Sequence, residues 1–163
     1  MNLRLTLLAL SLCMSTLCMA QLTPKAGCPD LTVDILNGTI NGLKANAAGP
    51  EFKKTVGCST GSDDAKCGGV IYYTDKDVCF YPQRKYFEIG LKFKGKMSMH
   101  VLGTPRNALF KYFGSPKVKD ALWDAFETQY GTLVLHYTVA GPAGKVKLIQ
   151  MSTLGTDELT LCE

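Results

Sequence analysis

Two segments of the chain alternate apolar and polar residues, and this alternation constrains the fold more than any other feature. Between residues 85 and 94 the apolar positions are Phe87, Ile89, Leu91 and Phe93. Between residues 131 and 139 they are Leu133, Leu135, Tyr137 and Val139. Successive side chains of a β-strand point to opposite faces of the sheet, so a period of two predicts strands that bury one face. The chain is therefore expected to form a sheet with one face in the core.

Four more segments read as strands because they are short, rich in β-branched and aromatic residues, and bounded by turn signals. They span residues 68–74, 77–82, 121–127 and 145–152. A turn at Asp75-Lys76 connects the first two. The Gly- and Pro-containing segment 140–144 is expected to form the hairpin loop before the last strand.

Residues 49–57 and 104–114 carry the signals of short helices. Each segment has a proline near its start and a glycine at its end, where helices tolerate or prefer these residues. Phe52 and Val56 form an apolar i, i+4 pair, and Leu109 and Phe113 form another. Helices this short gain stability only by packing an apolar stripe against another element.

The resulting order is helix, three strands, helix, three strands. An internal duplication is the economical explanation, and chance is the alternative, since the two halves share few identical residues. We expect an α+β domain made of two helix-plus-antiparallel-sheet repeats, about 38–96 and 97–155. The helices should pack on one sheet face and give two layers.

The N-terminus has the layout of an export signal. One positive charge precedes an apolar run of about 13 residues, and small residues precede Gln21. Residues 1–20 are therefore predicted to be a cleaved signal peptide, which leaves one mature domain, 21–163, in the periplasm or secreted. A membrane anchor is an alternative, but the run is short for a span. Lipidation at Cys13 or Cys18 is another, although a bulky leucine precedes each.

Charge and hydropathy exclude several classes of protein. Arg4 is the only charged residue of the predicted signal, so the mature chain has 17 basic and 14 acidic side chains, a net charge of +3. The basic residues are spread along the chain, which does not favour nucleic-acid binding. No second apolar segment is long enough for a membrane span.

The mature chain holds five cysteines: Cys28, Cys58, Cys67, Cys79 and Cys162. In an exported protein these are expected to form disulfides. Cys58 and Cys67 flank a polar loop, and Cys28 and Cys162 lie near the two chain ends, so we expect the pairs Cys58–Cys67 and Cys28–Cys162. Cys79 would then remain as a buried, inert thiol. No C-x-x-C pair is present and neither histidine lies near a cysteine, so no metal site is expected.

The sequence offers little for catalysis. His100 has no carboxylate close to it in sequence, and His136 falls on the polar side of a strand. A nucleophilic pair of Cys79 and His136 can be drawn, but no local signature supports it. No phosphate-binding glycine loop precedes a helix. We therefore expect neither catalytic residues nor a cofactor.

A binding surface has more support. Aromatic residues and a histidine can be placed on strands, mostly away from the buried face: Tyr72, Tyr81, Tyr86, Trp123 and His136. Tyrosine and tryptophan often carry the binding energy of protein interfaces. These five residues are the predicted interface. The alternative is that they form a second hydrophobic layer, covered by the N-terminal segment 22–40.

Two stretches of the sequence resemble segments of known protein families. A short helix ending in Val56-Gly57, then Cys58, a polar loop, Cys67 and an aromatic strand resembles the repeat of the β-lactamase inhibitor proteins. Residues 102–116 with Trp123 resemble the related small outer-membrane assembly lipoproteins. Together the resemblance covers about residues 38–152, but the second half lacks the cysteine pair. It implies a binding module that docks a protein on an open sheet face.

These inferences converge on one expected function. The protein is predicted to be an exported, non-catalytic module whose partner is another protein. An inhibitor or immunity role against a secreted or periplasmic enzyme is the sharper hypothesis. A structural or assembly role in the cell envelope is the alternative, followed by an unrecognised hydrolase.

Overall fold

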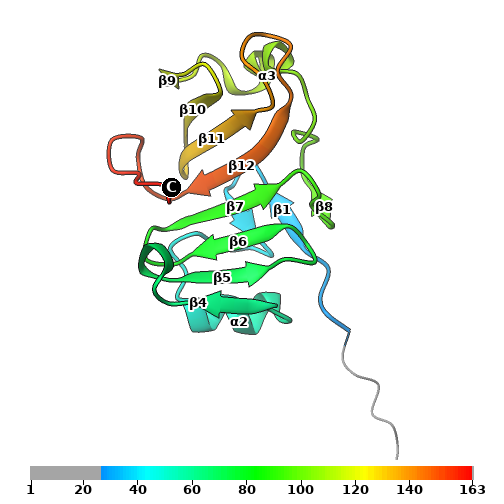
Figure 1. Ribbon diagram of the computed structural model, residues 1–163, viewed down its shortest axis with the longest axis vertical. Coiled ribbons are helices and arrows are strands. Elements are labelled where there is room, and N and C mark those ends of the chain that lie inside the picture. Colours follow the sequence, from blue (N-terminus) through cyan, green and yellow to red (C-terminus); the bar gives the residue numbers. More distant parts are fainter. Residues whose placement is uncertain (1–26, 163) are drawn as a thin grey trace, which may run out of the picture.

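An eight-stranded antiparallel sheet is the centre of the computed structural model, which describes residues 27–162 (Figure 1). Its strand order is β4-β5-β6-β7-β12-β11-β10-β9, so two four-stranded meanders meet where β7 pairs with β12. The strands are β4 (Gly61–Asp63), β5 (Val70–Tyr73), β6 (Val78–Tyr81), β7 (Tyr86–Gly90), β9 (Val118–Lys119), β10 (Trp123–Thr128), β11 (Gly131–Tyr137) and β12 (Val146–Ser152). The predicted signal peptide, 1–20, lies outside the described residues.

The six longest strands of this sheet are the six that the sequence predicted. The alternation, however, runs further than the strands themselves. β7 ends at Gly90, where the chain turns and the Phe93 amide donates to the Gly90 carbonyl. Leu91 and Val139 were expected on the buried face, but they follow the strand ends and are 54% and 56% exposed.

A second, four-stranded sheet was not predicted. Its order is β3-β2-β1-β8, and only the β1–β8 pair is parallel. The strands are β1 (Thr32–Asp34), β2 (Thr39–Ile40), β3 (Leu43–Lys44) and β8 (Lys96–Met97). Strands of two or three residues are too short to show a period of two. The turn dipeptides Asn37-Gly38 and Asn41-Gly42, which separate β1 from β2 and β2 from β3, are the signal that could have found them.

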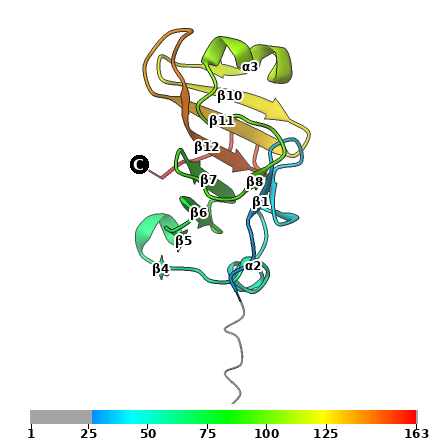
Figure 2. The same ribbon diagram turned by 90° about the vertical axis from the view of Figure 1, so that its right-hand side faces the viewer.

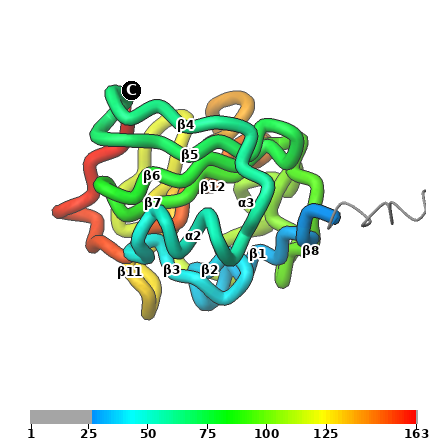
Figure 3. Tube along the Cα trace, turned by 90° about the horizontal axis from the view of Figure 1, so that it is seen from below, coloured from blue at the N-terminus to red at the C-terminus, as the bar shows by residue number. Residues whose placement is uncertain are grey.

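Both predicted helices are present, as α2 (Gly49–Val56) and α3 (Arg106–Phe113), and a short 3₁₀ turn η1 spans Lys66–Gly68. Gly57 (φ 64°) and Gly114 (φ 74°) follow the two α-helices in left-handed conformations that suit glycine. The helices and the small sheet lie on the same side of the large sheet, and the C-terminus lies on the other side (Figures 2 and 3).

The main core fills the space between the large sheet and this layer. We call the face of the large sheet that borders the core the inner face. Phe52 of α2 packs its ring against Phe80 and Phe87 of the inner face, with centroids 4.3 and 5.3 Å away. Val33 and Ile40 of the small sheet are fully buried in the same cluster. The small sheet therefore closes the core between the two helices.

The expected fold class was wrong. Among residues 27–162 the chain is mostly β, with twelve strands in two sheets and only two α-helices of eight residues each. It is not a two-layer α+β repeat with helices alone on the sheet face. The layer opposite the large sheet also contains the small sheet, and strands β1 and β2 bury their apolar side chains in the main core.

Two disulfides form, Cys28–Cys58 and Cys67–Cys162, and Cys79 is the one free thiol among the described cysteines. All four predicted cysteines are bonded, but the predicted pairing was wrong. β4 lies between Cys58 and Cys67 and pairs with β5, which places the two cysteines beyond opposite ends of the strand.

The disulfides bear on the compartment of the protein. Disulfides of this kind persist outside the cytoplasm, where the environment is oxidising. In residues 27–162 no helix has the length and apolar character needed to cross a membrane. The two disulfides are compatible with a periplasmic or extracellular protein.

Candidate docking surface

The outer face of the large sheet, which points away from the main core, carries its side chains in cross-strand rows. Strand register sets these rows. One row runs across the strands through Tyr72, Cys79, Glu88, Gln150, Val134 and Ala125. The next row contains Gly90, Leu148, His136 and Trp123. A third contains Tyr81, Tyr86, Ser152, Thr132 and Glu127.

All five residues of the predicted interface lie on this outer face, but they divide into two groups. Tyr72, Trp123 and His136 are half-buried and reach the surface. Tyr81 and Tyr86 are buried, with only 3% and 0% of their surface exposed, and their rings stack 4.5 Å apart. The structure therefore leaves three of the five residues accessible to a partner.

The C-terminal segment covers the two buried tyrosines. Leu159 and Leu161 pack with Tyr81 and Tyr86 in a second, smaller apolar cluster. The Cys162 amide donates to the Tyr86 hydroxyl at 3.0 Å. These two tyrosines thus belong to a second hydrophobic layer, as the alternative interpretation held. Residues 159–162 cover it, whereas the described part of the N-terminal segment, 27–40, contributes to the main core on the other side of the sheet.

Further bonds hold the C-terminal segment in place. Arg84 donates to the carbonyl oxygens of Thr160 and Leu161 at 3.1 and 3.4 Å, and to that of Cys67 at 3.1 Å. The Cys67–Cys162 disulfide adds a covalent link at the same place. The segment is thus fixed over the end of β6 and the start of β7, and to η1 through Cys67. In the sequence, residues 159–162 alternate apolar and polar side chains and end in a cysteine. This pattern is the signal that could have predicted a segment covering the sheet.

A chain of hydrogen bonds runs across the outer face, and its members alternate between buried side chains, Tyr81 and Gln150, and half-buried ones, Glu88 and His136. The Gln150 amide lies between two partners, with His136 Nε2 2.8 Å from its Oε1 and Glu88 Oε1 3.0 Å from its Nε2. Tyr81 donates to the other carboxylate oxygen of Glu88 at 3.1 Å. The buried Tyr81 and Gln150 thus hold the half-buried Glu88 and His136 in place, so a partner would meet these two side chains preorganised.

Neither Glu88 nor Gln150 was among the predicted interface residues. Alternation assigns a side chain to a face, but it does not reveal which strands become neighbours. The β7–β12 pairing that joins these two residues is non-local, and no sequence motif marks it.

A small notch opens beside the hydrogen-bonded row. Its volume is about 90 Å³, and it lies between the C-terminal segment and the β9–β11 end of the outer face. No charged side chain contributes to its walls. The lining residues are Val118, Trp123, Ala125, Thr132, Val134, Thr156, Leu159 and Leu161.

The two groups proposed for nucleophilic chemistry do not meet. Cys79 lies on β6 and His136 on β11, three strand steps or about 14 Å apart. Burial, followed by the charge of Glu88, raises the pKa of the Cys79 thiol to about 11. In residues 27–162 no three His, Cys, Asp or Glu side chains are placed to share a metal ion. His100 lies after β8, in the segment leading to α3.

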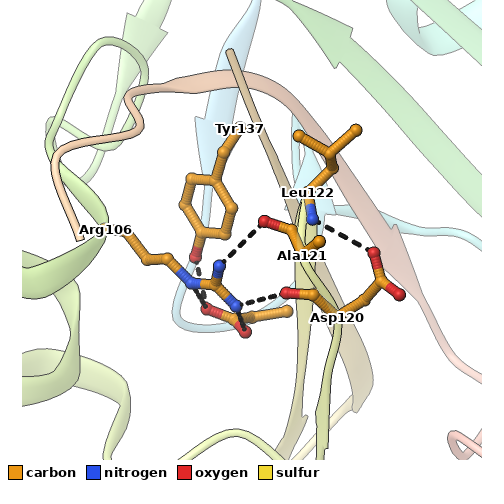
Figure 4. Close-up of polar contacts among 6 residues, drawn as sticks. Arg106, Asp120, Ala121, Leu122 and Tyr137 are labelled. Atoms are coloured by element: carbon orange, nitrogen blue, oxygen red, sulfur yellow. Dashed lines mark hydrogen bonds and ion pairs between the residues drawn. The ribbon is translucent and has the colours of Figure 1, made fainter. Parts of the chain in front are cut away.

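A second polar cluster lies inside the core (Figure 4). Arg106 of α3 forms a two-point ion pair with Asp124 of β10, and the two residues are only 4% and 0% exposed. The Tyr137 hydroxyl donates to Asp124 at 2.8 Å, and the Arg106 guanidinium lies 4.7 Å from the Tyr137 ring centroid. The hydrogen bond to Asp124 raises the pKa of Arg106.

This buried cluster attaches α3 to the sheet. Arg106 also donates to the carbonyl oxygens of Asp120 and Ala121, at 2.7 and 3.1 Å, so its charge is well satisfied. Enclosure and satisfied hydrogen bonds are the marks of a structural ion pair. We assign the cluster to stability and not to the docking surface.

Searches against protein-family models, curated proteins and solved structures find no match to the chain. The resemblance to β-lactamase inhibitor proteins and to small outer-membrane assembly lipoproteins therefore stays a prediction from short motifs. The candidate site depends on the geometry of the outer face alone.

Proposed function

We propose that the protein is an exported, non-catalytic module that binds another protein on the exposed part of its outer sheet face. One observation carries the proposal. Tyr72, Trp123 and His136, chosen from sequence as interface residues, lie half-exposed on the same face of one sheet, the face opposite the main core. Rigid strands hold them in place, so binding would require little ordering of side chains.

The chemistry of the face supports binding over catalysis. The separation of Cys79 from His136 and the raised pKa of the thiol both disfavour a thiolate nucleophile. The accessible part of the outer face combines the rings of Tyr72 and Trp123 with the carboxylate of Glu88, and protein interfaces favour aromatic residues at their centres. Export is supported by the N-terminal pattern and the two disulfides.

Within this proposal, we favour an inhibitor or immunity role against a secreted or periplasmic enzyme. The motif resemblance and the exposed aromatic and charged face support it. An assembly role in the envelope predicts a different partner, because the captured proteins would then be outer-membrane components. Identifying the partner therefore separates the two roles.

Affinity capture with the mature protein, followed by alanine variants, tests the proposal. Tyr72→Ala and Trp123→Ala are each expected to weaken binding of the captured protein by at least about tenfold, because central aromatic residues often contribute more than 1 kcal/mol. Tyr112→Ala is the matched control, since Tyr112 is 53% exposed on α3, on the other side of the large sheet. Binding that neither outer-face variant weakens would show that the interface lies elsewhere.

A further inference from the structure

We infer that the docking surface recognises a partner segment with one Lys or Arg side chain and one apolar side chain about 10–14 Å apart. The basic side chain would bind Glu88, and the apolar side chain would enter the notch beside Trp123. This inference rests on the proposed function and specifies the chemistry of its partner.

Glu88 provides the first contact. Its carboxylate is half-buried near the middle of the outer face and accepts hydrogen bonds from two neutral donors, Tyr81 and Gln150. A carboxylate has about four acceptor positions, so two remain. None of the three ion pairs formed among the described residues includes Glu88. Its charge therefore has no cationic partner within the described chain.

The surroundings of Glu88 favour a cation from outside. Asp77 adds negative charge in this region. The charges of Glu88 and Asp77 both raise the pKa of the Cys79 thiol, whereas the charge of Lys66 lowers it. Partial burial strengthens a charged contact relative to open water. A guanidinium or ammonium group could use the free acceptor positions of Glu88 without breaking the existing bonds.

The notch provides the second contact. Its volume of about 90 Å³ corresponds to roughly three water molecules, which suits one aliphatic side chain. Its lining is apolar except for two threonines, and Trp123 forms part of it. An apolar anchor entering a small pocket is a common feature of binding hot spots.

Strand register sets the distance between the two contacts. Glu88, Gln150 and Val134 are consecutive members of one cross-strand row, and Val134 lines the notch. The two strand steps to Val134 amount to about 10 Å, and the third step, to Trp123 and Ala125 on β10, brings the separation to about 14 Å. A loop or hairpin of the partner could present both side chains across that distance, so both contacts can form at once.

A library of disulfide-closed peptides, selected on the immobilised mature protein without reductant, tests this inference. Recovered peptides are expected to share a basic residue and a large apolar residue. Glu88→Gln should weaken a recovered peptide by at least about tenfold and reduce the salt dependence of its binding, because an ion pair is lost. Ala125→Ile fills the notch and should weaken the peptide to a similar degree. Tyr112→Ala should leave it unchanged.

Each variant is first checked by urea unfolding. If Ala125→Ile is not folded, Val118→Trp replaces it, because Val118 lies at the notch and is 39% exposed. The inference is overturned if no peptide is recovered, if recovered peptides lack the basic or the apolar residue, or if neither Glu88→Gln nor the notch variant weakens them.

The same variants separate this inference from the proposed function. If Trp123→Ala weakens the captured natural partner but Glu88→Gln does not, the docking role stands and the assigned partner chemistry is wrong. If none of the outer-face variants weakens the natural partner, both are wrong.

Discussion

Replacing Asp124 with Asn is expected to lower the free energy of unfolding by about 3–5 kcal/mol, because it leaves the Arg106 guanidinium buried without a counter-charge. The amide oxygen of the new side chain can still accept from the Tyr137 hydroxyl and Arg106 Nε, but its NH2 group then faces the Arg106 Nη2 donor, so one hydrogen bond of the pair is lost together with the charge. Urea unfolding at neutral pH, followed by circular dichroism, measures the change.

The matched control is Glu127→Gln, which removes the acidic partner of an ion pair on the surface. Lys117 and Glu127 are 3.2 Å apart, and both side chains are more than half exposed. Exposed pairs contribute little, so the control should lose less than about 1 kcal/mol. If Asp124→Asn lost no more than Glu127→Gln, the buried cluster would not be what attaches α3 to the sheet.

Removing the Cys67–Cys162 disulfide with paired serine substitutions is expected to lower the free energy of unfolding by about 4–5 kcal/mol on the chain-entropy model. The bond closes a loop with a sequence separation of 95 residues, so it restricts the unfolded chain strongly. Cys28–Cys58, with a separation of 30, should contribute about 1 kcal/mol less. Urea unfolding of the two double-serine variants without reductant provides the comparison.

The Cys67→Ser/Cys162→Ser variant should also loosen the cover of the outer face. Residues 159–162 would then be held only by non-covalent contacts, including those from Arg84 and Tyr86. Amide hydrogen exchange in this segment is therefore expected to accelerate in this variant and to stay unchanged when Cys28 and Cys58 are replaced. Equal exchange in both variants would contradict the role assigned to the disulfide.

Local patterns predicted the parts of the fold that local physics determines. Period-two alternation and turn residues located the six longest strands, and glycines at Gly57 and Gly114 marked where the helices end. Each of these signals acts within a few residues of the chain. The small sheet gave no such pattern, because its strands have only two or three residues.

Non-local features could not be predicted in the same way. Cysteine pairing depends on which chain segments meet, and the insertion of β4 separates Cys58 from Cys67. The Arg106–Asp124 ion pair joins a helix to a strand 18 residues later, without a motif. Similarly, the alternation of apolar and polar residues along a strand cannot show that a later segment of the chain will cover Tyr81 and Tyr86.

The candidate site was predicted in part for the same reason. Alternation placed Tyr72, Trp123 and His136 on the open side of their strands, and the structure brings them to one outer face. Glu88 and Gln150 acquire their importance only through the pairing of β7 with β12. The central claim is that this face binds a protein.

Site-specific photo-crosslinking tests that claim most directly. A photoreactive amino acid replaces Leu148, which lies half-buried on the outer face beside His136, or Tyr112 on α3 as the control. We expect a covalent adduct with the captured partner from position 148 and none from position 112. An adduct from position 112 alone would contradict it.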